Sequence, residues 1–272
     1  LRNFYYRKPK RTNNRSIYIG LLFIMSMGII ADYISVEQFG NPSIIEYTEN
    51  VIAENNPKIS YLSYLIHKGE SFNRAENDYN RGSSRCTRSN RMNLRLVDMT
   101  VNEIMYYQNL QPCTAKVLFA VGKWQIIPDT LAAAIRDLKI DKSRKFNINL
   151  QNEIFVNYLT KNKRPAIYNY IITGEGLKLA ARDVAREWAS IGSPIHCKIP
   201  VIKRVGGRLK VVGIRPWKQG GGCYDGLGTN RHLISADKNL KALQKARSEY
   251  VNLRKQGYSQ KIAYRKSLGI NE

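Results

Sequence analysis

The residues of this chain that are best suited to chemistry lie where an apolar helix pattern meets a polar loop. Apolar residues recur at helical spacing between Ile59 and Ile66, and Glu70 follows them directly, ahead of the polar segment 73–95. An apolar wall beside a carboxyl group raises its pKa by desolvation, as a general acid that protonates a glycosidic oxygen requires. A glutamate after a helix is more often a solvated charge, so Glu70 alone indicates only a candidate acid.

Short motifs around and beyond Glu70-Ser71 strengthen the case for this acid. In chain order they are DYNRG at 78–82, GKWQIIPDTL at 122–131, EWASIG at 187–192 and YDGLGTN at 224–230. In this order they resemble motifs of lysozyme-like phage enzymes, lambda-type endolysins and lytic transglycosylases, in which a Glu-Ser pair ends the first helix. The resemblance covers about residues 59–250, and it departs from the family where Glu-Ser-Gly-Gly becomes Glu70-Ser71-Phe72-Asn73.

The resemblance implies an activity and a set of site residues. It implies cleavage of the β-1,4 bond between N-acetylmuramic acid and N-acetylglucosamine in peptidoglycan, with Glu70 as general acid and base and with no cofactor. The positions that match sugar-binding groups of the family are Ser71, Tyr79, Asn80, Trp124, Gln125 and Tyr224. An amide such as that of Gln125 suits an N-acetyl group, and Trp124 suits the apolar face of a sugar. For Trp188, which lies among helical apolar residues, we expect core packing instead.

A second carboxylate would decide between two reactions. Classical hydrolysis uses a pair of carboxylates, and the nearest candidates are Glu76 and Asp78 in the polar loop. Asp78 is the candidate for the second carboxylate beside Glu70. Lambda-type enzymes and lytic transglycosylases use one essential glutamate, first as acid and then as base, while the muramic 6-hydroxyl closes an anhydro ring. We favour the transglycosylase reaction, and the sequence leaves hydrolysis open.

The charge of the chain restricts its partners. Lys and Arg number 44 against 21 Asp and Glu, which gives a formal charge of +23 and attracts polyanions such as nucleic acid, anionic lipid or acidic envelope polymers. Nucleic acid is an unlikely partner because the charge is spread along the chain and no nucleic-acid motif is visible. Peptidoglycan is the expected partner. The alternative is a non-catalytic basic structural or virion protein that binds cell wall, membrane or nucleic acid.

The N-terminal segment predicts a membrane anchor. Six cations precede the uncharged run 16–31, an arrangement that keeps the N-terminus in the cytoplasm. We expect a single transmembrane signal anchor within residues 16–36 and a catalytic domain in the periplasm, elsewhere outside the cytoplasm, or on a virion membrane. A cleaved signal peptide is the alternative. Phage lysis, wall penetration during phage entry and a secretion apparatus all fit, with virion or envelope-complex proteins as further partners.

The cysteines predict two disulfides in an oxidising compartment. Two β-branched runs around Gly206-Gly207 predict a hairpin over 198–214, and its ends should bring Cys197 and Cys223 together. We therefore expect Cys197–Cys223 and Cys86–Cys113, with a crossed pairing or four free thiols as alternatives. The three histidines are scattered and no metal-ligand spacing occurs, so no metal site is predicted.

The predicted organisation is a mainly α domain of the α+β class, lysozyme-like, with an inserted β-hairpin and a transmembrane helix in front. Thr100 should open a helix through a capping box with Glu103. Further helices are expected over 129–138, 149–159, 177–191 and 235–254. The domains follow as a basic N-terminus and anchor at 1–36, a linker at 37–57, the catalytic domain at 58–254 and a basic tail at 255–272.

Overall fold

The structure is a computed structural model of the chain, which divides into two units, Leu1–Ile44 and Ile45–Glu272. It describes residues 61–70, 75–79, 94–110, 117–205, 208–226 and 230–270, all of which belong to the second unit. The predicted anchor at 16–36 and the linker at 37–57 lie outside the described residues.

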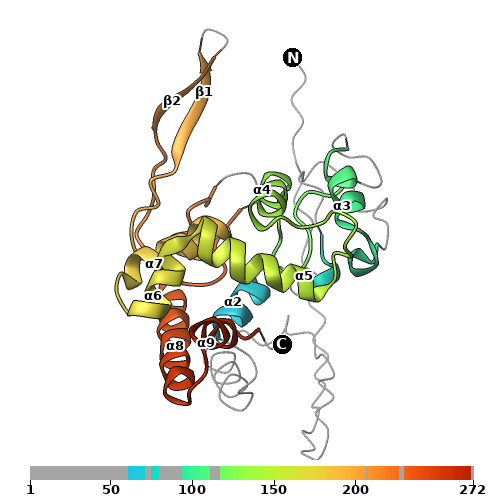
Figure 1. The fold of residues 1–272 in the computed structure, drawn as a ribbon. Coiled ribbons are helices and arrows are strands. Elements are labelled where there is room, and N and C mark those ends of the chain that lie inside the picture. The colour runs from blue at the N-terminus through green and yellow to red at the C-terminus, as the bar shows by residue number, and fades with distance from the viewer. Residues whose placement is uncertain are drawn as a thin grey trace, which may run out of the picture. The chain divides into compact units, whose positions relative to one another are not determined.

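The described residues form a mainly helical domain with one antiparallel hairpin (Figure 1). In chain order the elements are α2 (Tyr61–Glu70), η2 (Ala75–Asn77), η4 (Leu96–Asp98), α3 (Val101–Gln108), α4 (Pro128–Leu138), α5 (Ile148–Glu153), η5 (Ile154–Lys163), α6 (Pro165–Thr173), α7 (Leu177–Glu187), β1 (Pro200–Val205), β2 (Arg208–Ile214), α8 (Ala236–Lys255) and α9 (Gln260–Ser267).

Helix starts follow the capping residues of the sequence. The Thr100 side chain accepts a hydrogen bond from the Glu103 amide at 3.2 Å, and Glu103 Oε2 accepts one from the Thr100 amide at 2.6 Å. The capping box predicted for α3 is therefore confirmed. The Ser235 side chain likewise accepts from the Lys238 amide and begins α8, and Pro128 occupies the first turn of α4.

The helix predicted over 149–159 continues further and changes its winding. It begins as α5 and runs without a break into the π-helix η5, which ends at Lys163. In the wider turn, the hydroxyl of Thr160 donates to the carbonyl oxygens of Phe155 and Val156 at 3.1 Å. The Thr160 hydroxyl in turn accepts from Tyr264 of α9 at 2.8 Å, so the π-helix and α9 are joined inside the core.

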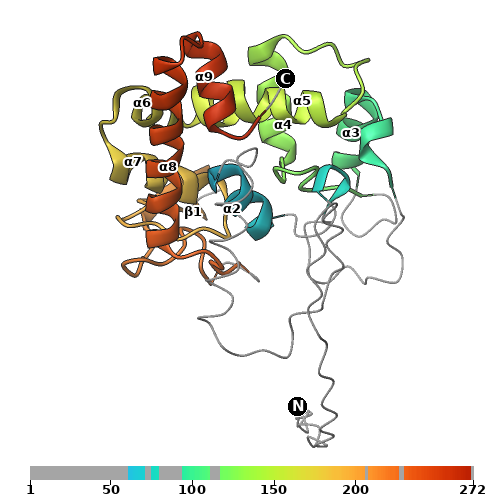
Figure 2. The same ribbon diagram turned by 90° about the horizontal axis from the view of Figure 1, so that it is seen from below.

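The long helix α8 is the element on which α2, α6, α7 and α9 pack (Figure 2). The apolar face predicted for α2 is buried, with Leu62, Leu65 and Ile66 at most 2% exposed. One continuous apolar core runs from α2 to Ile270 and holds the carboxyl end of α2, where Glu70 stands, in a fixed place.

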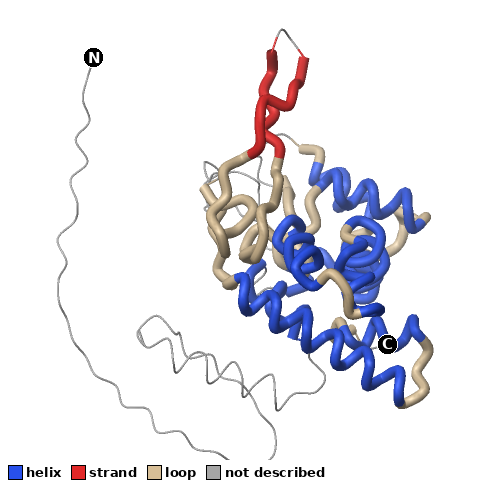
Figure 3. Tube along the Cα trace, turned by 90° about the vertical axis from the view of Figure 1, so that its left-hand side faces the viewer, coloured by secondary structure: helices blue, strands red, loops and turns tan. Residues whose placement is uncertain are grey.

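The predicted hairpin is confirmed. Strands β1 and β2 pair antiparallel from Pro200 opposite Ile214 to Val205 opposite Arg208, with a bulge between Val201 and Ile202. Figures 1 and 3 show the hairpin projecting away from the helices, so its strands add no layer to the helical core.

Three predictions about the architecture need correction. The fold class included an N-terminal transmembrane helix, which is not seen: no helix in the described ranges is long and apolar enough to cross a membrane. Residues assigned to a basic tail instead form α9, whose Ala263 and Tyr264 are buried, so the compact domain extends to Ile270. Helix α6, which begins at Pro165 and ends before Gly174, was not predicted.

Candidate active site

The carboxyl group of Glu70 is held by a residue that lies 120 positions away in the sequence. Glu70 is the last residue of α2, and its Oε1 accepts two hydrogen bonds from Ser190. The Ser190 amide donates at 3.0 Å and the Ser190 hydroxyl at 2.6 Å. Both bonds end on the same oxygen, so Oε2 is the carboxyl oxygen that neither of them engages.

The backbone around Ser190 is anchored to the segment that leads into α8. The carbonyl oxygen of Ser190 accepts from the amides of Leu233 at 2.7 Å and Ile234 at 3.0 Å. Inside α8, the buried amide of Asn239 donates to the carbonyl oxygen of Gly192 at 3.0 Å and to that of Ala181 at 2.8 Å. The loop after α7 is therefore bonded to α8 and to the segment that precedes it, which holds the donors that face Glu70.

Close packing at Gly69 brings α2 against this loop. A Cβ added at Gly69 would lie 2.3 Å from Ser190 Oγ and 2.9 Å from Ser190 Cβ. Gly192 is confined by backbone atoms, because an added Cβ would lie 2.6 Å from the Gly220 carbonyl oxygen and 2.9 Å from the Ala236 amide nitrogen. Glycines at these two positions permit the approach on which the Glu70–Ser190 contact depends.

Burial dominates the electrostatics of Glu70. Desolvation raises the pKa of the Glu70 carboxyl above its ordinary value of 4.5, and the two Ser190 hydrogen bonds oppose that rise only in part. The negative charge of Glu187 raises the pKa of Glu70 further. Residue 70 as a whole is only partly exposed, and its buried carboxyl group retains a proton to higher pH than the carboxyl group of a solvated glutamate does.

Glu187 itself stays neutralised by two cations. Its carboxylate is 8% exposed and accepts from Lys163 Nζ at 2.7 Å and from Arg164 Nε at 2.8 Å. Lys163 also donates to the Thr130 hydroxyl, which ties the end of η5 to α4. This ion-pair group stands one residue before Trp188 and orients the start of the loop that carries Ser190.

Two predicted site residues, Gln125 and Asp78, lie in contact. Gln125 Nε2 contacts Asp78 Oδ2 at 3.4 Å and donates to the Gly122 carbonyl oxygen at 3.0 Å. Gln125 adopts a left-handed backbone with φ of 48°, a conformation that a non-glycine residue takes only when its surroundings require it. Tyr79 is buried and bridges to Val121, so the 76–79 and 121–126 segments run side by side.

The last turn of α2 lies near this second segment as well. Burial lowers the pKa of His67, the positive charge of Lys123 lowers it further, and the negative charge of Glu76 opposes both. Gln151 of α5 connects the same residues, since its Oε1 accepts from the Lys123 amide and its Nε2 donates to the Glu76 carbonyl oxygen. The end of α2 is thus flanked by Ser190 and by the Glu76–Lys123 region.

Two aromatic residues of the motifs belong to the core. The Trp124 ring is 1% exposed and stacks on Phe155 with ring centroids 3.8 Å apart, which leaves no face for a sugar in this conformation. The core packing expected for Trp188 is confirmed, because this residue is 2% exposed and its Nε1 donates to the Trp124 carbonyl oxygen at 3.2 Å. Trp124 is therefore not retained among the sugar contacts.

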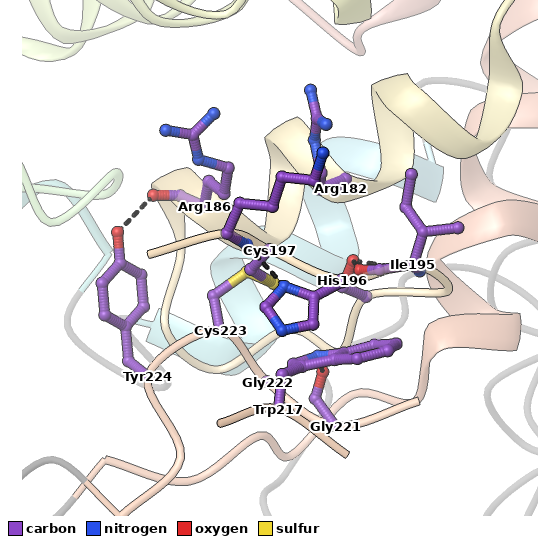
Figure 4. The surroundings of a disulfide bond; sticks show 12 residues. Arg182, Arg186, Ile195, His196, Cys197, Trp217, Gly221, Gly222, Cys223 and Tyr224 are labelled. Atoms are coloured by element: carbon purple, nitrogen blue, oxygen red, sulfur yellow. Dashed lines mark hydrogen bonds between the residues drawn. A yellow bond between two sulfur atoms is a disulfide. The ribbon is translucent and has the colours of Figure 1, made fainter. Parts of the chain in front are cut away.

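Tyr224 stands beside the disulfide at the end of α7. Its hydroxyl donates to the Arg186 carbonyl oxygen at 2.8 Å, and Figure 4 shows the ring next to the bond between Cys197 and Cys223. The predicted Cys197–Cys223 pairing is confirmed. On the other side of the disulfide the His196 ring lies against Trp217, with ring centroids 5.5 Å apart.

Several predicted residues lie outside the described ranges, namely Ser71, Asn80, Cys86 and Cys113. Conversely, the structure adds Ser190 and Glu187, which the sequence analysis did not select as site residues. Both residues belong to the EWASIG motif at 187–192, but only the fold shows that Ser190 contacts Glu70. In the described part of the chain, no group of three or more His, Cys, Asp or Glu side chains could hold a metal ion.

Comparisons with known proteins add no relative. No family model matches the chain, and neither a curated protein nor a solved structure shows significant similarity to it.

Proposed function

We propose that this protein cleaves the glycan strands of peptidoglycan at the bond between N-acetylmuramic acid and N-acetylglucosamine, with Glu70 as general acid and then general base. The observation that carries the proposal is the Glu70 carboxyl at the end of α2, whose pKa is raised by burial and whose Oε1 is fixed by Ser190. A raised pKa keeps a proton available for a leaving glycosidic oxygen.

The two Ser190 bonds assign different tasks to the two carboxyl oxygens. Oε1 accepts both hydrogen bonds, so Oε2 carries the proton and delivers it to the glycosidic oxygen. After that transfer Glu70 is a carboxylate, and it can accept a proton from the group that attacks the sugar. In a transglycosylase this group is the muramic 6-hydroxyl, and in a hydrolase it is water.

We favour the transglycosylase reaction, in which Asp78 does not act on the sugar. Asp78 faces Gln125 and the Gly122 turn, an arrangement that supports a role in holding this segment. We predict that Asp78→Asn lowers activity less than tenfold, on the order expected for a lost positioning contact, against a much larger loss in Glu70→Gln. Equal losses in the two variants would instead favour a hydrolase with two carboxylates.

The Cys197–Cys223 disulfide supports a location outside the cytoplasm, where such bonds persist. There the domain meets the cell wall directly. The motif resemblance favours a phage protein that acts in lysis or in wall penetration during entry.

Digestion of purified sacculi tests the proposal. Wild-type protein should release soluble muropeptides, and mass spectrometry should find anhydro-muramic ends. Glu70→Gln is the matched control, because its amide oxygen can still accept from Ser190. Reducing ends would replace the transglycosylase by a hydrolase, and no release by correctly folded wild type would favour the non-catalytic wall-binding alternative.

A further inference from the structure

The β1–β2 hairpin exposes apolar side chains that the domain does not cover. Val211 is 66% exposed, Val212 48% and Ile214 60%. All residues from Lys210 to Ile214 are exposed, and successive side chains of a strand alternate between its two faces, so neither face of the hairpin packs on the helices. Exposed aliphatic side chains gathered on one projecting element mark an interaction surface.

The same segment carries only positive charge. No Asp or Glu occurs between Trp188 and Tyr224, while seven cations lie between Lys198 and Lys218. The described side chains of Lys203 and Lys210 are exposed on the hairpin. A surface of this kind attracts an anionic partner and repels a second copy of the same hairpin.

The combination of charge and apolar surface restricts the partner further. A soluble polyanion would neutralise the lysines but would leave Val211, Val212 and Ile214 in water. A flat protein surface would cover one face of the hairpin only. An anionic bilayer satisfies both requirements, because its phosphates meet the cations and its interfacial region can surround, on both faces, a hairpin that lies lengthwise in it.

We propose that the β1–β2 hairpin docks this domain on an anionic lipid bilayer with its strands lying along the membrane surface. Val211, Val212 and Ile214 then lie in the interfacial region, and Lys203 and Lys210, which pair across the two strands, lie at the phosphates. Hairpin and active site belong to the same domain, so docking holds Glu70 near the membrane surface, where the adjoining cell wall is within reach. The docking does not depend on cleavage, so Glu70→Gln should bind lipid as the wild type does.

The test requires a local measurement, because retention of the full chain on vesicles reports on every segment. Hydrogen–deuterium exchange is therefore followed in peptides covering 198–215 of the full chain, with increasing amounts of vesicles. Equimolar phosphatidylcholine and phosphatidylglycerol should slow exchange in these peptides. Each cation near an anionic leaflet strengthens binding about fivefold, and a phosphatidylcholine leaflet carries no net charge. Pure phosphatidylcholine should therefore bind the hairpin weakly and leave the exchange rates of these peptides within about twofold of those without lipid.

Two double variants separate charge from apolar contact. Lys203→Glu with Lys210→Glu should raise the vesicle concentration for half-maximal protection by at least about twentyfold. Its control, Lys241→Glu with Lys255→Glu on α8, makes the same change of charge at exposed positions elsewhere.

The apolar variant is Val211→Thr with Val212→Thr, which keeps the β-branched shape and should raise the same concentration about tenfold. Its control, Phe119→Gln with Leu179→Gln, removes side chains that are 42% and 46% exposed on the helical part of the domain. Both controls should behave as the wild type does.

The outcomes are distinct. Protection by anionic vesicles that both hairpin variants weaken supports the proposal. Equal protection by pure phosphatidylcholine, or hairpin variants that match their controls, overturns it. Loss in the lysine variant alone means attraction by charge without burial of Val211, Val212 and Ile214, as any polyanion could supply, and it overturns the proposed apolar contact. Protection that grows with protein concentration without lipid points to a second copy and overturns docking on a bilayer.

Discussion

The helical region around Glu70 and the region enclosed by Cys197 and Cys223 are held together in different ways. The helical region has one large apolar core that extends from α2 to α9. The hairpin region has a small buried cluster of Ala185, Cys197 and Cys223, with Ile199, Trp217 and Tyr224 packed against it. The Glu70–Ser190 contact thus lies where apolar burial holds the helices together, whereas the projecting element depends on a covalent link.

Polar contacts supplement the disulfide where apolar burial is scarce. Trp217 Nε1 donates to the Gly221 carbonyl oxygen at 3.0 Å, and Asp225 Oδ2 accepts from the Gly222 amide at 2.7 Å. The imidazole of His232 lies 2.7 Å from the same carboxylate oxygen. Substitutions should therefore separate the two regions, with activity lost in one and stability lost in the other.

The largest expected effect is that of Glu70→Gln on glycan cleavage. Losing the general acid should lower the rate on purified sacculi by about 10²–10⁴-fold. Hairpin variants such as Val211→Thr should cleave soluble muropeptide oligomers at the wild-type rate, because that side chain is exposed and lies outside the site. Residual activity of Glu70→Gln within about twofold of wild type would remove Glu70 from the mechanism.

The pH dependence of the melting temperature shows whether Glu70→Gln still folds. The folded pKa of Glu70 is raised, so the folded state binds more protons than the unfolded state between the two pKa values. The contribution of this group to stability is therefore fully present below the unfolded pKa and is lost as pH rises through the folded pKa. Glu70→Gln lacks that loss, and its melting temperature at neutral pH should equal or exceed that of wild type.

The next effect is the loss of stability when the disulfide is removed. Cys197→Ser with Cys223→Ser opens a closed loop with a sequence separation of 26 residues. The chain-entropy treatment assigns about 3–4 kcal/mol to such a bond. Urea unfolding should show this decrease, while cleavage below the transition should stay within about twofold of wild type, since Glu70 and Ser190 lie outside the loop. Loss of cleavage without loss of stability would contradict the separation of the two regions.

A matched pair of glycines gives a smaller and sharper contrast. Gly69→Ala places a Cβ 2.3 Å from Ser190 Oγ, whereas no atom lies within 4 Å of a Cβ added at Gly213 in β2. Displacing Ser190 should lower cleavage on the order of tenfold or more, because small shifts of reacting groups are costly. Gly213→Ala should change neither cleavage nor melting temperature, and a similar loss in both variants would argue against the Glu70–Ser190 contact as the cause.

The smallest effect is that of Ser190→Ala on the pH profile of cleavage. The Ser190 hydroxyl bond lowers the pKa of Glu70, so its removal should raise that pKa further. The alkaline limb of the profile, where the acid loses its proton, should move to higher pH, and the maximal rate should fall only modestly. A limb that stays in place while the rate falls would mean that Ser190 serves packing alone.

Local signals of the sequence predicted much of the fold. The capping box at Thr100 and the β-branched runs around the paired glycines each act within a few residues, and α3 and the hairpin formed where expected. Helix α9 was missed because Lys261, Arg265 and Lys266 made its segment resemble a solvated tail. Its apolar side chains nevertheless pack into the core, which the composition of a short segment does not reveal.

The site was predictable only in part, for a physical reason. The motif around Glu70 identifies a carboxyl group behind an apolar helix, but its hydrogen-bond partner comes from a loop 120 residues away. The same limit applies to Trp124, whose motif position suggested a sugar contact. The Trp124 ring stacks on Phe155 because η5 packs against the 121–126 segment, and a local sequence pattern does not predict which distant segments pack together.

The Cα atoms of Cys197 and Cys223 lie 5.5 Å apart, so the chain leaves the domain and returns to it at nearly one point. The returning part of the excursion, at Gly220 and Gly221, packs against the loop that carries Ser190, whereas the hairpin from Pro200 to Ile214 projects beyond the helices. An insertion with such a narrow base can lengthen, shorten or be exchanged during evolution without displacing the elements that support it. The same geometry makes this position a natural site for grafting a different recognition loop onto an otherwise unchanged domain.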